Sequence, residues 1–236
     1  MKNKIGIIGS GNIGWAIKKL LKDTYDLKIG DLKDGLDATS EEQVKKFLEG
    51  SEAVISAGPY AVNKTIAKVA AEDTLKLLSE VHGMNYNIAV PHNIVGPNQK
   101  YDDPFRNVMS IFINRNLQGQ PSIIYGDGLQ ERCFSYIDDV IYCLEKLALD
   151  KDIKKEIINI GPDEETTTVI ELSKMVANET RFNGNPIFVK DRPKEVKFAS
   201  CSSDKARKLL GYKTKTSLHD SIKLTADYIR QRGVRK

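Results

Sequence analysis

The chain has 236 residues, of which 40% are hydrophobic and 29% are charged, and its formal net charge is +4. This composition is typical of a globular protein, and the length allows one sizeable core or two small lobes that share one. No basic stripe with interleaved aromatic residues is present, so we expect no nucleic-acid partner. No run approaches the ~20 apolar residues of a membrane span, so we expect no membrane partner.

The cysteine pattern bears on cellular location. Cys133, Cys143 and Cys201 are odd in number, with no C-x-x-C spacing and no paired histidine ligands. We therefore expect a reduced, cytoplasmic protein without a metal site. The early apolar run is interrupted from Gly9 onward, before a signal peptide could form, which favours the same location.

The first part of the chain alternates apolar runs with amphipathic helical patterns. Such alternation predicts a parallel β-sheet with right-handed crossovers. Ser40, with Gln43 at the third helical position, is typical of a helix start. We predict strands over residues 4–9, 27–31, 53–57 and 87–90, helices over residues 12–22 and 60–82, and a further helix that begins after Ser40.

The pattern changes after Gly96-Pro97. No internal repeat and no low-complexity linker is visible, so we expect two lobes packed together rather than two independent domains. These lobes are residues 1–97 and 98–236, with segments of 133–160 packing back on the first lobe. In the second lobe we predict helices over residues 105–117, 138–149, 168–178, 203–210 and 217–232, and strands over residues 122–125, 157–160 and 187–189.

A glycine-rich sequence, G-S-G-N-I-G, starts at Gly9 between a predicted strand and a predicted helix. Its first glycine permits a tight turn, its second lets backbone N–H groups approach a pyrophosphate, and its third allows close helix–strand packing. Asp31 ends the next predicted strand, where a carboxylate can bind both ribose hydroxyls of NAD and repel the 2′-phosphate of NADP. The alternative is a glycine-rich turn with a surface aspartate. We expect NAD at Gly9, Gly11, Asn12, Ile13, Gly14, Asp31 and Ala57.

Six later segments of the sequence carry a second resemblance. They are Y-A-V-N-K, V-P-H-N-I-V-G-P-N-Q, Y-G-D-G-L-Q-E-R-C-F-S-Y-I-D-D-V, I-N-I-G-P-D-E-E-T-T-T-V-I-E-L, R-P-K-E-V and S-S-D-K-A-R-K-L-L-G-Y. With them, residues from about 60 to the end resemble the NAD-dependent epimerase/dehydratase family of extended short-chain dehydrogenases, such as UDP-glucose 4-epimerase. Residues 4–72 instead resemble the NAD-binding start of saccharopine-dehydrogenase-like proteins, through K-I-G-I-I-G-S-G-N-I-G, L-D-A-T-S-E-E-Q-V-K-K-F-L and A-V-I-S-A-G-P-Y.

The family resemblance implies chemistry on a nucleotide sugar, with a UDP-sugar as the expected substrate. Asn93, Arg132 and Arg192 match family positions that contact the nucleotide diphosphate or the sugar. Phe134 and Glu195 match positions near the nucleotide. Guanidinium groups suit a diphosphate, because two charge-assisted hydrogen bonds fix its orientation. The alternative is that the two arginines are surface residues paired with nearby carboxylates.

Tyr60 and Lys64 form a Tyr-x-x-x-Lys pair, which is the candidate catalytic pair. Epimerases of the resembled family pass a hydride from the sugar to NAD and return it to the other face, and the sugar hydroxyl loses its proton meanwhile. A tyrosine can take that proton if its pKa falls well below ~10. A lysine one helical turn later favours the phenolate and can hydrogen-bond the nicotinamide ribose.

One strand–helix unit of the family is missing between the predicted strand 53–57 and helix 60–82. The family's Ser/Thr partner of the tyrosine belongs well upstream, and Ser56 is only four residues from Tyr60, which makes it a poor substitute. A shift of the helix by one strand position would move Tyr60 by ~5 Å. Two interpretations of Tyr60 therefore stay open: a catalytic residue, or an aromatic residue that follows a proline without a catalytic role.

The sequence as a whole predicts an α/β protein. Its first lobe is a Rossmann-like, doubly wound parallel sheet shortened by one strand–helix unit, and its second is a smaller α/β lobe for the substrate. We expect an NAD-dependent nucleotide-sugar epimerase or dehydratase. The alternatives are a catalytically inactive relative that binds NAD and a nucleotide sugar, and a saccharopine-type amino-acid dehydrogenase. A homodimer is compatible with the sequence.

Overall fold

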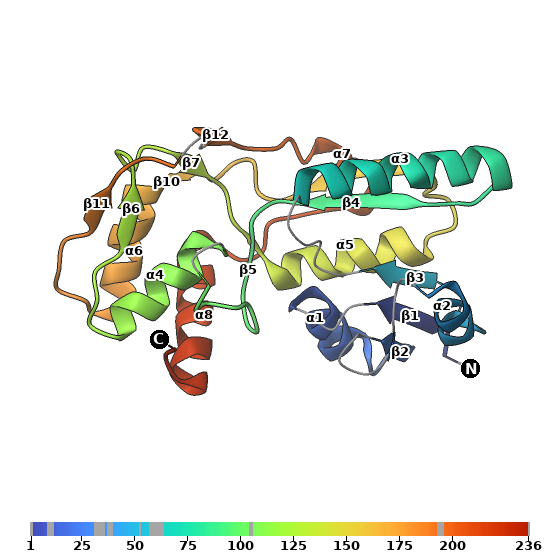
Figure 1. Cartoon of the computed structure of the whole chain (residues 1–236), viewed down its shortest axis with the longest axis horizontal. Helices are drawn as coiled ribbons and strands as arrows, with labels where there is room; N and C mark the ends of the chain where they lie inside the picture. The colour runs from blue at the N-terminus through green and yellow to red at the C-terminus, as the bar shows by residue number, and fades with distance from the viewer. Residues whose placement is uncertain are drawn as a thin grey trace. The chain divides into compact units, whose positions relative to one another are not determined.

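The computed structural model of the chain describes residues 2–8, 12–30, 36, 40–51, 53–56, 64–103, 106–192 and 196–235. Contacts divide the chain into two compact units, Met1–Val90 with Ile141–Ile158, and Pro91–Val140 with Asn159–Lys236. Figure 1 labels the elements of both units. No helix within the described residues is long and apolar enough to cross a membrane. The functional division of the chain at residue 97 stays a prediction.

The first unit contains a three-stranded parallel sheet in the order β2-β1-β3. Its strands are β1 (Lys4–Ile8), β2 (Asp26–Gly30) and β3 (Ala53–Ser56). Ile5 and Ile7 on β1 are fully buried, and Gly6 between them lies so close to Leu48 that an added Cβ would come within 2.7 Å of its Cδ2 atom. The central strand is therefore buried on both faces, as its uninterrupted apolar sequence predicts. The connections carry the helices α1 (Asn12–Leu21) and α2 (Glu41–Leu48).

A second ladder in this part of the chain joins β4 (Asn87–Pro91) to β9 (Glu156–Ile160). Helix α3 (Lys64–His82) precedes β4, and α5 (Ile137–Leu149) precedes β9. Asn87 holds the ladder to the end of α5, because its amide donates to the Leu147 carbonyl at 2.8 Å and to the Ile153 carbonyl at 2.9 Å. Among the described strands, no ladder joins β3 to β4, which is the place where the sequence lacks one strand–helix unit.

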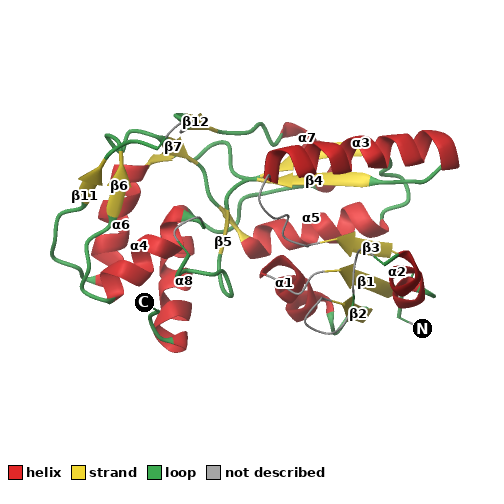
Figure 2. Cartoon of the chain, viewed as in Figure 1, coloured by secondary structure: helices red, strands yellow, loops and turns green. Residues whose placement is uncertain are grey.

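The second unit packs three helices together: α4 (Val108–Leu117), α6 (Val169–Thr180) and α8 (Leu218–Arg232). Helix α7 (Asp204–Leu210) also belongs to this unit. Figure 2 shows short strands beside these helices. The ladders are β6 (Ile123–Tyr125) with β11 (Ile187–Val189), β5 (Ile94–Val95) with β8 (Ser135–Tyr136), and β7 (Glu131–Arg132) between β10 (Thr167–Thr168) and β12 (Phe198–Ala199).

Two helix ends of this unit follow from their local sequence, whereas α4 begins at Val108 rather than at 105 and α6 continues to Thr180 rather than ending at 178. Thr168 and Glu171 form a capping box at the start of α6, with the Thr168 hydroxyl accepting from the Glu171 N–H and the Glu171 carboxylate accepting from the Thr168 N–H. Gly211 ends α7 in the left-handed conformation that glycine adopts without steric cost. The two-residue strands β5, β7, β8, β10 and β12 are too short to show a period in the sequence, and we did not expect them.

Candidate functional site

The three parallel strands of the first unit end side by side. Ile8 pairs with Gly30 on one neighbouring strand and with Ser56 on the other, so all three strands end at the same edge of the sheet. Ligands of open α/β sheets bind at this carboxyl edge. The chain continues from these three residues directly into the positions predicted to bind NAD. Helix α1 begins at Asn12, so the glycine-rich sequence lies between a strand and a helix, as a dinucleotide site requires.

Some predicted site residues lie in described helices: Asn12, Ile13 and Gly14 form the first turn of α1, and Lys64 is the first residue of α3. Others lie outside the described part of the chain, namely Gly9, Gly11, Asp31, Ala57, Tyr60 and Glu195. Because Tyr60 is among them, the arrangement of the catalytic pair stays a prediction.

The second unit contains a pocket of about 190 Å³. One face of α4 lines part of it, because Val108, Ile111, Phe112 and Arg115 recur at helical spacing. The other lining residues lie on or near β6, β7 and β11, just before α4, and at the start of α6. No aspartate or glutamate is among the described residues that line the pocket. The pocket thus combines an apolar side with positive charge, which suits an anionic ligand that also carries a ring. Its arginines are Arg106, Arg115, Arg132 and Arg192.

Arg192 and Tyr125 form one wall of this pocket. The Arg192 guanidinium lies over the Tyr125 ring, 3.8 Å from its centre. Strands β6 and β11 place the two residues together, since Val189 pairs with Tyr125 in their parallel ladder and Arg192 follows three residues later. Stacking on an aromatic face restricts the orientation of the guanidinium group.

Arg132 lies on β7, the central strand of the β10-β7-β12 ladder. Its Nη1 atom donates to the Glu131 carbonyl at 2.7 Å, and the side chain is half-buried at the pocket. The position of the arginine is therefore fixed by backbone on its own strand. The pocket brings Arg132 and Arg192 together, two of the residues predicted to hold a diphosphate.

Gln130 also lines the pocket, and the sequence did not single it out. Its side-chain amide donates to the Tyr125 carbonyl at 2.6 Å. Its buried Oε1 atom has no hydrogen-bond partner within the part of the chain that the structure describes. A buried acceptor without a partner costs about 1–3 kcal/mol, so a ligand N–H or O–H at this point would remove that cost. The signal was available, because Gln130 lies in the same Y-G-D-G-L-Q-E-R segment as Arg132.

Asn93 and Phe134 lie close to the pocket segments without lining the pocket. The Asn93 amide donates to the Cys133 carbonyl at 2.9 Å, and Asn93 has a positive φ of 36°. This bond joins the second residue after β4 to the residue after Arg132. Phe134 is 6% exposed and belongs to the core of the unit. The structure thus gives Phe134 a packing role and places Asn93 beside the strand that carries Arg132.

Three comparisons place the chain among known proteins. The family described as NAD dependent epimerase/dehydratase matches residues 39–161, slightly more than half of the chain. A protein of Methanocaldococcus jannaschii, named provisionally as a UDP-glucose 4-epimerase, is 35% identical over 174 residues, 73% of this chain and 53% of that protein. The UDP-glucose 4-epimerase of Mycolicibacterium smegmatis is 27% identical over 179 residues, 75% of this chain and 54% of that protein. The chain spans about half the length of these curated relatives.

Solved structures show the same fold. A UDP-glucose 4-epimerase from Thermotoga maritima, solved with UDP-glucose, matches with a TM-score of 0.83 and 22% identity, over 97% of this chain and 99% of that one. At this identity the likeness concerns the fold alone. It confirms the expected Rossmann-like α/β architecture. The resemblance of residues 4–72 to saccharopine-dehydrogenase-like proteins stays a prediction.

Proposed function

The chain belongs to the NAD-dependent epimerase/dehydratase family, and from that premise we propose that it moves hydride between NAD and a carbon of a nucleotide sugar. The observation that carries the proposal is the arginine-lined pocket of the second unit. The pocket lies among the sequence segments that resemble the family. Arg192, which stacks on Tyr125, and Arg132, which lies on β7, are the two arginines expected to contact the diphosphate. Relatives that the chain resembles are named as UDP-sugar epimerases and decarboxylases, which supports a UDP-sugar as the substrate.

In this proposal the pocket holds the nucleotide. Arg192 and Arg132 donate hydrogen bonds to the diphosphate, and a guanidinium can offer two parallel N–H groups to phosphate oxygens. The apolar face of α4, with Ile111 and Phe112, covers the ring of the base. Gln130 accepts an N–H or O–H of the nucleotide at its unpartnered Oε1 atom. Asn93 lies beside this segment, and we assign its remaining amide hydrogen to a sugar-phosphate oxygen.

The first unit holds NAD at the carboxyl edge of the β2-β1-β3 sheet. The backbone of the G-S-G-N-I-G sequence and the start of α1 accept the pyrophosphate, because helix N-termini present unpaired N–H groups and a partial positive charge. Asp31 directly follows the end of β2 and selects NAD over NADP through the ribose hydroxyls. Bound NAD supplies the chemistry of taking a hydride from the sugar and returning it.

Tyr60 and Lys64 move the proton. Tyr60 takes the hydroxyl proton as the sugar carbon loses its hydride, so that the C–O bond becomes a carbonyl. Lys64 stabilises the phenolate that must form before this transfer. When the hydride that NAD would supply returns to the other face, Tyr60 would give the proton back and the epimer would form. No net oxidation of the sugar results.

A second candidate is a relative that binds NAD and a nucleotide sugar without turnover. One observation favours it: the described strands show no ladder between β3 and β4. A helix displaced by a missing strand would carry Tyr60 away from productive geometry, where an error of ~1 Å can cost about 100-fold in rate.

Turnover and binding separate the two candidates. Purified protein is mixed with NAD and either UDP-glucose or UDP-galactose, and the other epimer is measured by chromatography, while calorimetry measures NAD and UDP binding. The proposed enzyme forms the epimer and binds both ligands. Binding of both ligands without any epimer supports the second candidate, and binding of neither contradicts both.

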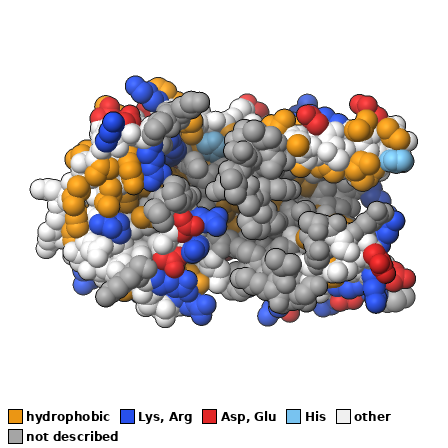
Figure 3. All heavy atoms as spheres, in the orientation of Figure 1, with side chains coloured by type: hydrophobic (Ala, Val, Ile, Leu, Met, Phe, Trp, Pro, Cys, Tyr) orange, Lys and Arg blue, Asp and Glu red, His pale blue; other side chains and the backbone are white. Residues whose placement is uncertain are grey.

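We also propose a cytoplasmic homodimer. The three cysteines are all free thiols, which supports a reducing compartment. Helix α3 exposes Val69, Leu77 and Val81 by 52%, 57% and 64%, and Figure 3 shows hydrophobic side chains gathered over this helix. Such a surface supports association with a second copy. Light scattering on the purified protein measures the mass, and a monomer at all concentrations contradicts the dimer.

A further inference from the structure

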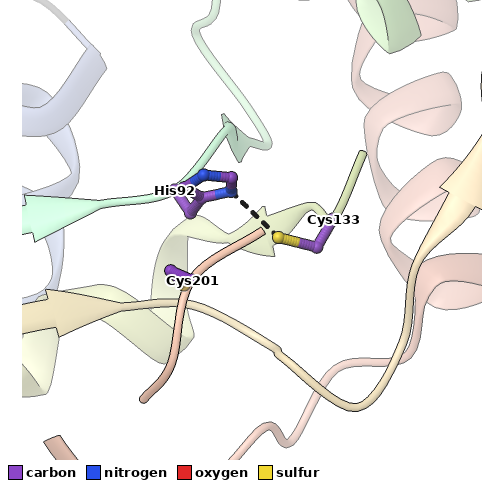
Figure 4. Close-up of side chains that lie close together, drawn as sticks. All are labelled: His92, Cys133 and Cys201. Carbon is purple, nitrogen blue, oxygen red and sulfur yellow. Dashed lines mark hydrogen bonds between the residues drawn. The ribbon is translucent and has the colours of Figure 1, made fainter. Parts of the chain in front are cut away.

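His92, Cys133 and Cys201 come together in the second unit from three separate segments. One ligand atom from each, a ring nitrogen and two sulfurs, can be chosen so that all lie within 4.8 Å of one another. The Nδ1 atom of His92 is 2.9 Å from the Cys133 sulfur, and Figure 4 shows the imidazole directed at that sulfur. The spacing in the sequence hides this cluster, because 41 and 68 residues separate its members.

The surrounding backbone holds the cluster in place. Gly161 lies against it, and an added Cβ there would come within 2.9 Å of the His92 Cβ and 3.6 Å of the Cys201 sulfur. The His92 N–H donates to the Ile160 carbonyl at 2.9 Å, and the Ser135 hydroxyl donates to the His92 carbonyl at 2.5 Å. The absence of a side chain at Gly161 lets the segments of His92 and Cys201 come close together, and the hydrogen bonds fix the backbone of His92.

A nucleophilic cysteine does not fit these residues. Cys133 is fully buried, so no substrate carbon can reach its sulfur. Burial also disfavours the charged thiolate, which is the form that a reactive cysteine requires.

We propose that His92, Cys133 and Cys201 bind one Zn²⁺ ion, with a water molecule or another ligand in the fourth position. Two sulfurs and one imidazole are a ligand set that Zn²⁺ prefers. Zinc bonds of about 2.3 Å to sulfur and about 2.0–2.1 Å to nitrogen place tetrahedral donors about 3.6–3.8 Å apart. The present distances, 2.9 Å between His92 Nδ1 and the Cys133 sulfur and at most 4.8 Å within the cluster, lie on either side of this spacing.

The charges balance in the bound form. Zn²⁺ displaces one proton from each thiol, so that two thiolates and a neutral imidazole surround a divalent cation and the site carries no net charge. A neutral site costs little to bury. His92 and Cys201 are partly exposed to solvent, so the ion would reach the site on their side.

The ion joins segments that the proposed function uses. His92 directly precedes Asn93, and Cys133 lies between Arg132 and Phe134. Zinc would therefore hold the Arg132 strand and the Asn93 turn in one arrangement. This consequence rests on the proposed function, but zinc binding itself does not, so the two can fail separately.

Metal titration tests the site without any substrate. Protein that has been reduced and stripped of metal is titrated with Zn²⁺ by calorimetry and with Co²⁺ by absorption. We expect one ion per chain and a thiolate-to-cobalt charge-transfer band. Cys201→Ala should weaken Zn²⁺ binding by at least about 100-fold, since even loss of outer-shell support costs 10–100-fold. Cys143→Ala, which changes the cysteine outside the cluster, should bind as the wild type does.

Thiol protection is a second test that needs no variant. Alkylation of Cys201 by iodoacetamide, followed by mass spectrometry, should slow when Zn²⁺ is present, while the buried Cys143 reacts equally slowly with and without the ion. Absence of stoichiometric Zn²⁺ or Co²⁺ binding overturns the proposal. So does an equal loss of binding in Cys201→Ala and Cys143→Ala, or unchanged alkylation of Cys201.

Discussion

The Arg192 guanidinium lies over the Tyr125 ring, 3.8 Å from its centre, at one wall of the pocket. Two parallel strands produce this contact, because β6 ends at Tyr125 and β11 ends at Val189, its ladder partner. The stacked arginine is thus oriented before a ligand arrives. Less side-chain entropy is lost on binding when the binding group is already held.

Replacing Arg192 tests whether this wall binds a diphosphate. Arg192→Ala should weaken UDP binding roughly 10- to 100-fold, since a hydrogen bond to a charged group contributes about 1.5–3 kcal/mol. Arg192→Lys should recover only part of the affinity, because an ammonium group cannot offer two parallel bonds. Calorimetric titration with UDP measures both effects. Arg232→Ala, at the exposed end of α8, is the control. Equal UDP affinities in all these proteins would contradict diphosphate binding in the pocket.

Replacing Gly96 with alanine tests how tightly the turn after β5 packs against its neighbours. An added Cβ would come within 2.7 Å of the Ile137 side chain, and the φ angle is +139°. Gly119 also has a positive φ, +72°, but an added Cβ there meets nothing within 4 Å. Both Gly→Ala variants carry backbone strain, and Gly96→Ala adds overpacking of about 1–3 kcal/mol. Urea unfolding should show the larger loss for Gly96→Ala, and equal losses would mean that the turn is loosely packed.

Replacing Asp139 tests how much its buried hydrogen bonds to the segment before α8 stabilise the fold. Its carboxylate is 3% exposed and accepts the backbone N–H groups of Lys215 at 3.1 Å and Thr216 at 3.0 Å. Asp139→Ala leaves both donors without this acceptor, so the free energy of unfolding should fall by roughly 2 kcal/mol or more. Asp138→Ala, next to it on the exposed side of the same helical turn, should lose less than about 1 kcal/mol. Similar losses in the two variants would contradict the role of the buried carboxylate.

Asp163 gives the stability of the second unit a pH dependence. It accepts Arg207 Nη2 at 2.7 Å and the Ser203 N–H at 2.8 Å, and the Arg207 guanidinium holds the pKa of its carboxyl well below the ordinary 3.8. A lowered pKa means that the stabilisation is present above 3.8 and is lost as the pH falls through the pKa of the folded protein. Asp163→Asn should therefore cost roughly 1–2 kcal/mol at neutral pH, a modest value because Arg207 is 41% exposed to solvent.

The expected cost of Asp163→Asn should persist down to about pH 4 and shrink only below it. Unfolding in urea at a series of pH values measures the difference between the two proteins. Glu164→Gln is a suitable control, since Glu164 lies 3.9 Å from the same arginine and is 57% exposed. A difference that disappears already near neutral pH would contradict this assignment.

Much of this fold could be predicted, because the apolar residues of its longer helices and strands recur with the spacing typical of each element. Ile5 and Ile7 mark a buried strand, and Ser40 does cap α2, with its hydroxyl accepting the Gln43 N–H. The two-residue strands could not be predicted, because two residues show neither alternation nor length. They depend on pairing partners distant in the sequence, as β7 does between β10 and β12.

The pocket could be predicted only in part. Arg132 and Arg192 were found through their motifs, since charged residues at fixed places in a family segment stand out. Tyr125 and Gln130 were missed, because a tyrosine at a strand end and a glutamine in a loop have ordinary packing explanations. The His92, Cys133 and Cys201 cluster was missed for another reason. Its members lie far apart in the sequence, and only the tertiary structure brings them within reach of one ion.

Turnover of a UDP-sugar by the wild type and by Tyr60→Phe is the most direct test of the proposed chemistry. We expect the wild type to interconvert the two epimers in the presence of NAD. We expect Tyr60→Phe to lose about 100-fold or more of this activity with unchanged NAD and UDP affinities, since a positioned acid–base group typically contributes 10²–10⁴-fold. A wild type that binds both ligands without forming any epimer, or a Tyr60→Phe variant as active as the wild type, would contradict that chemistry.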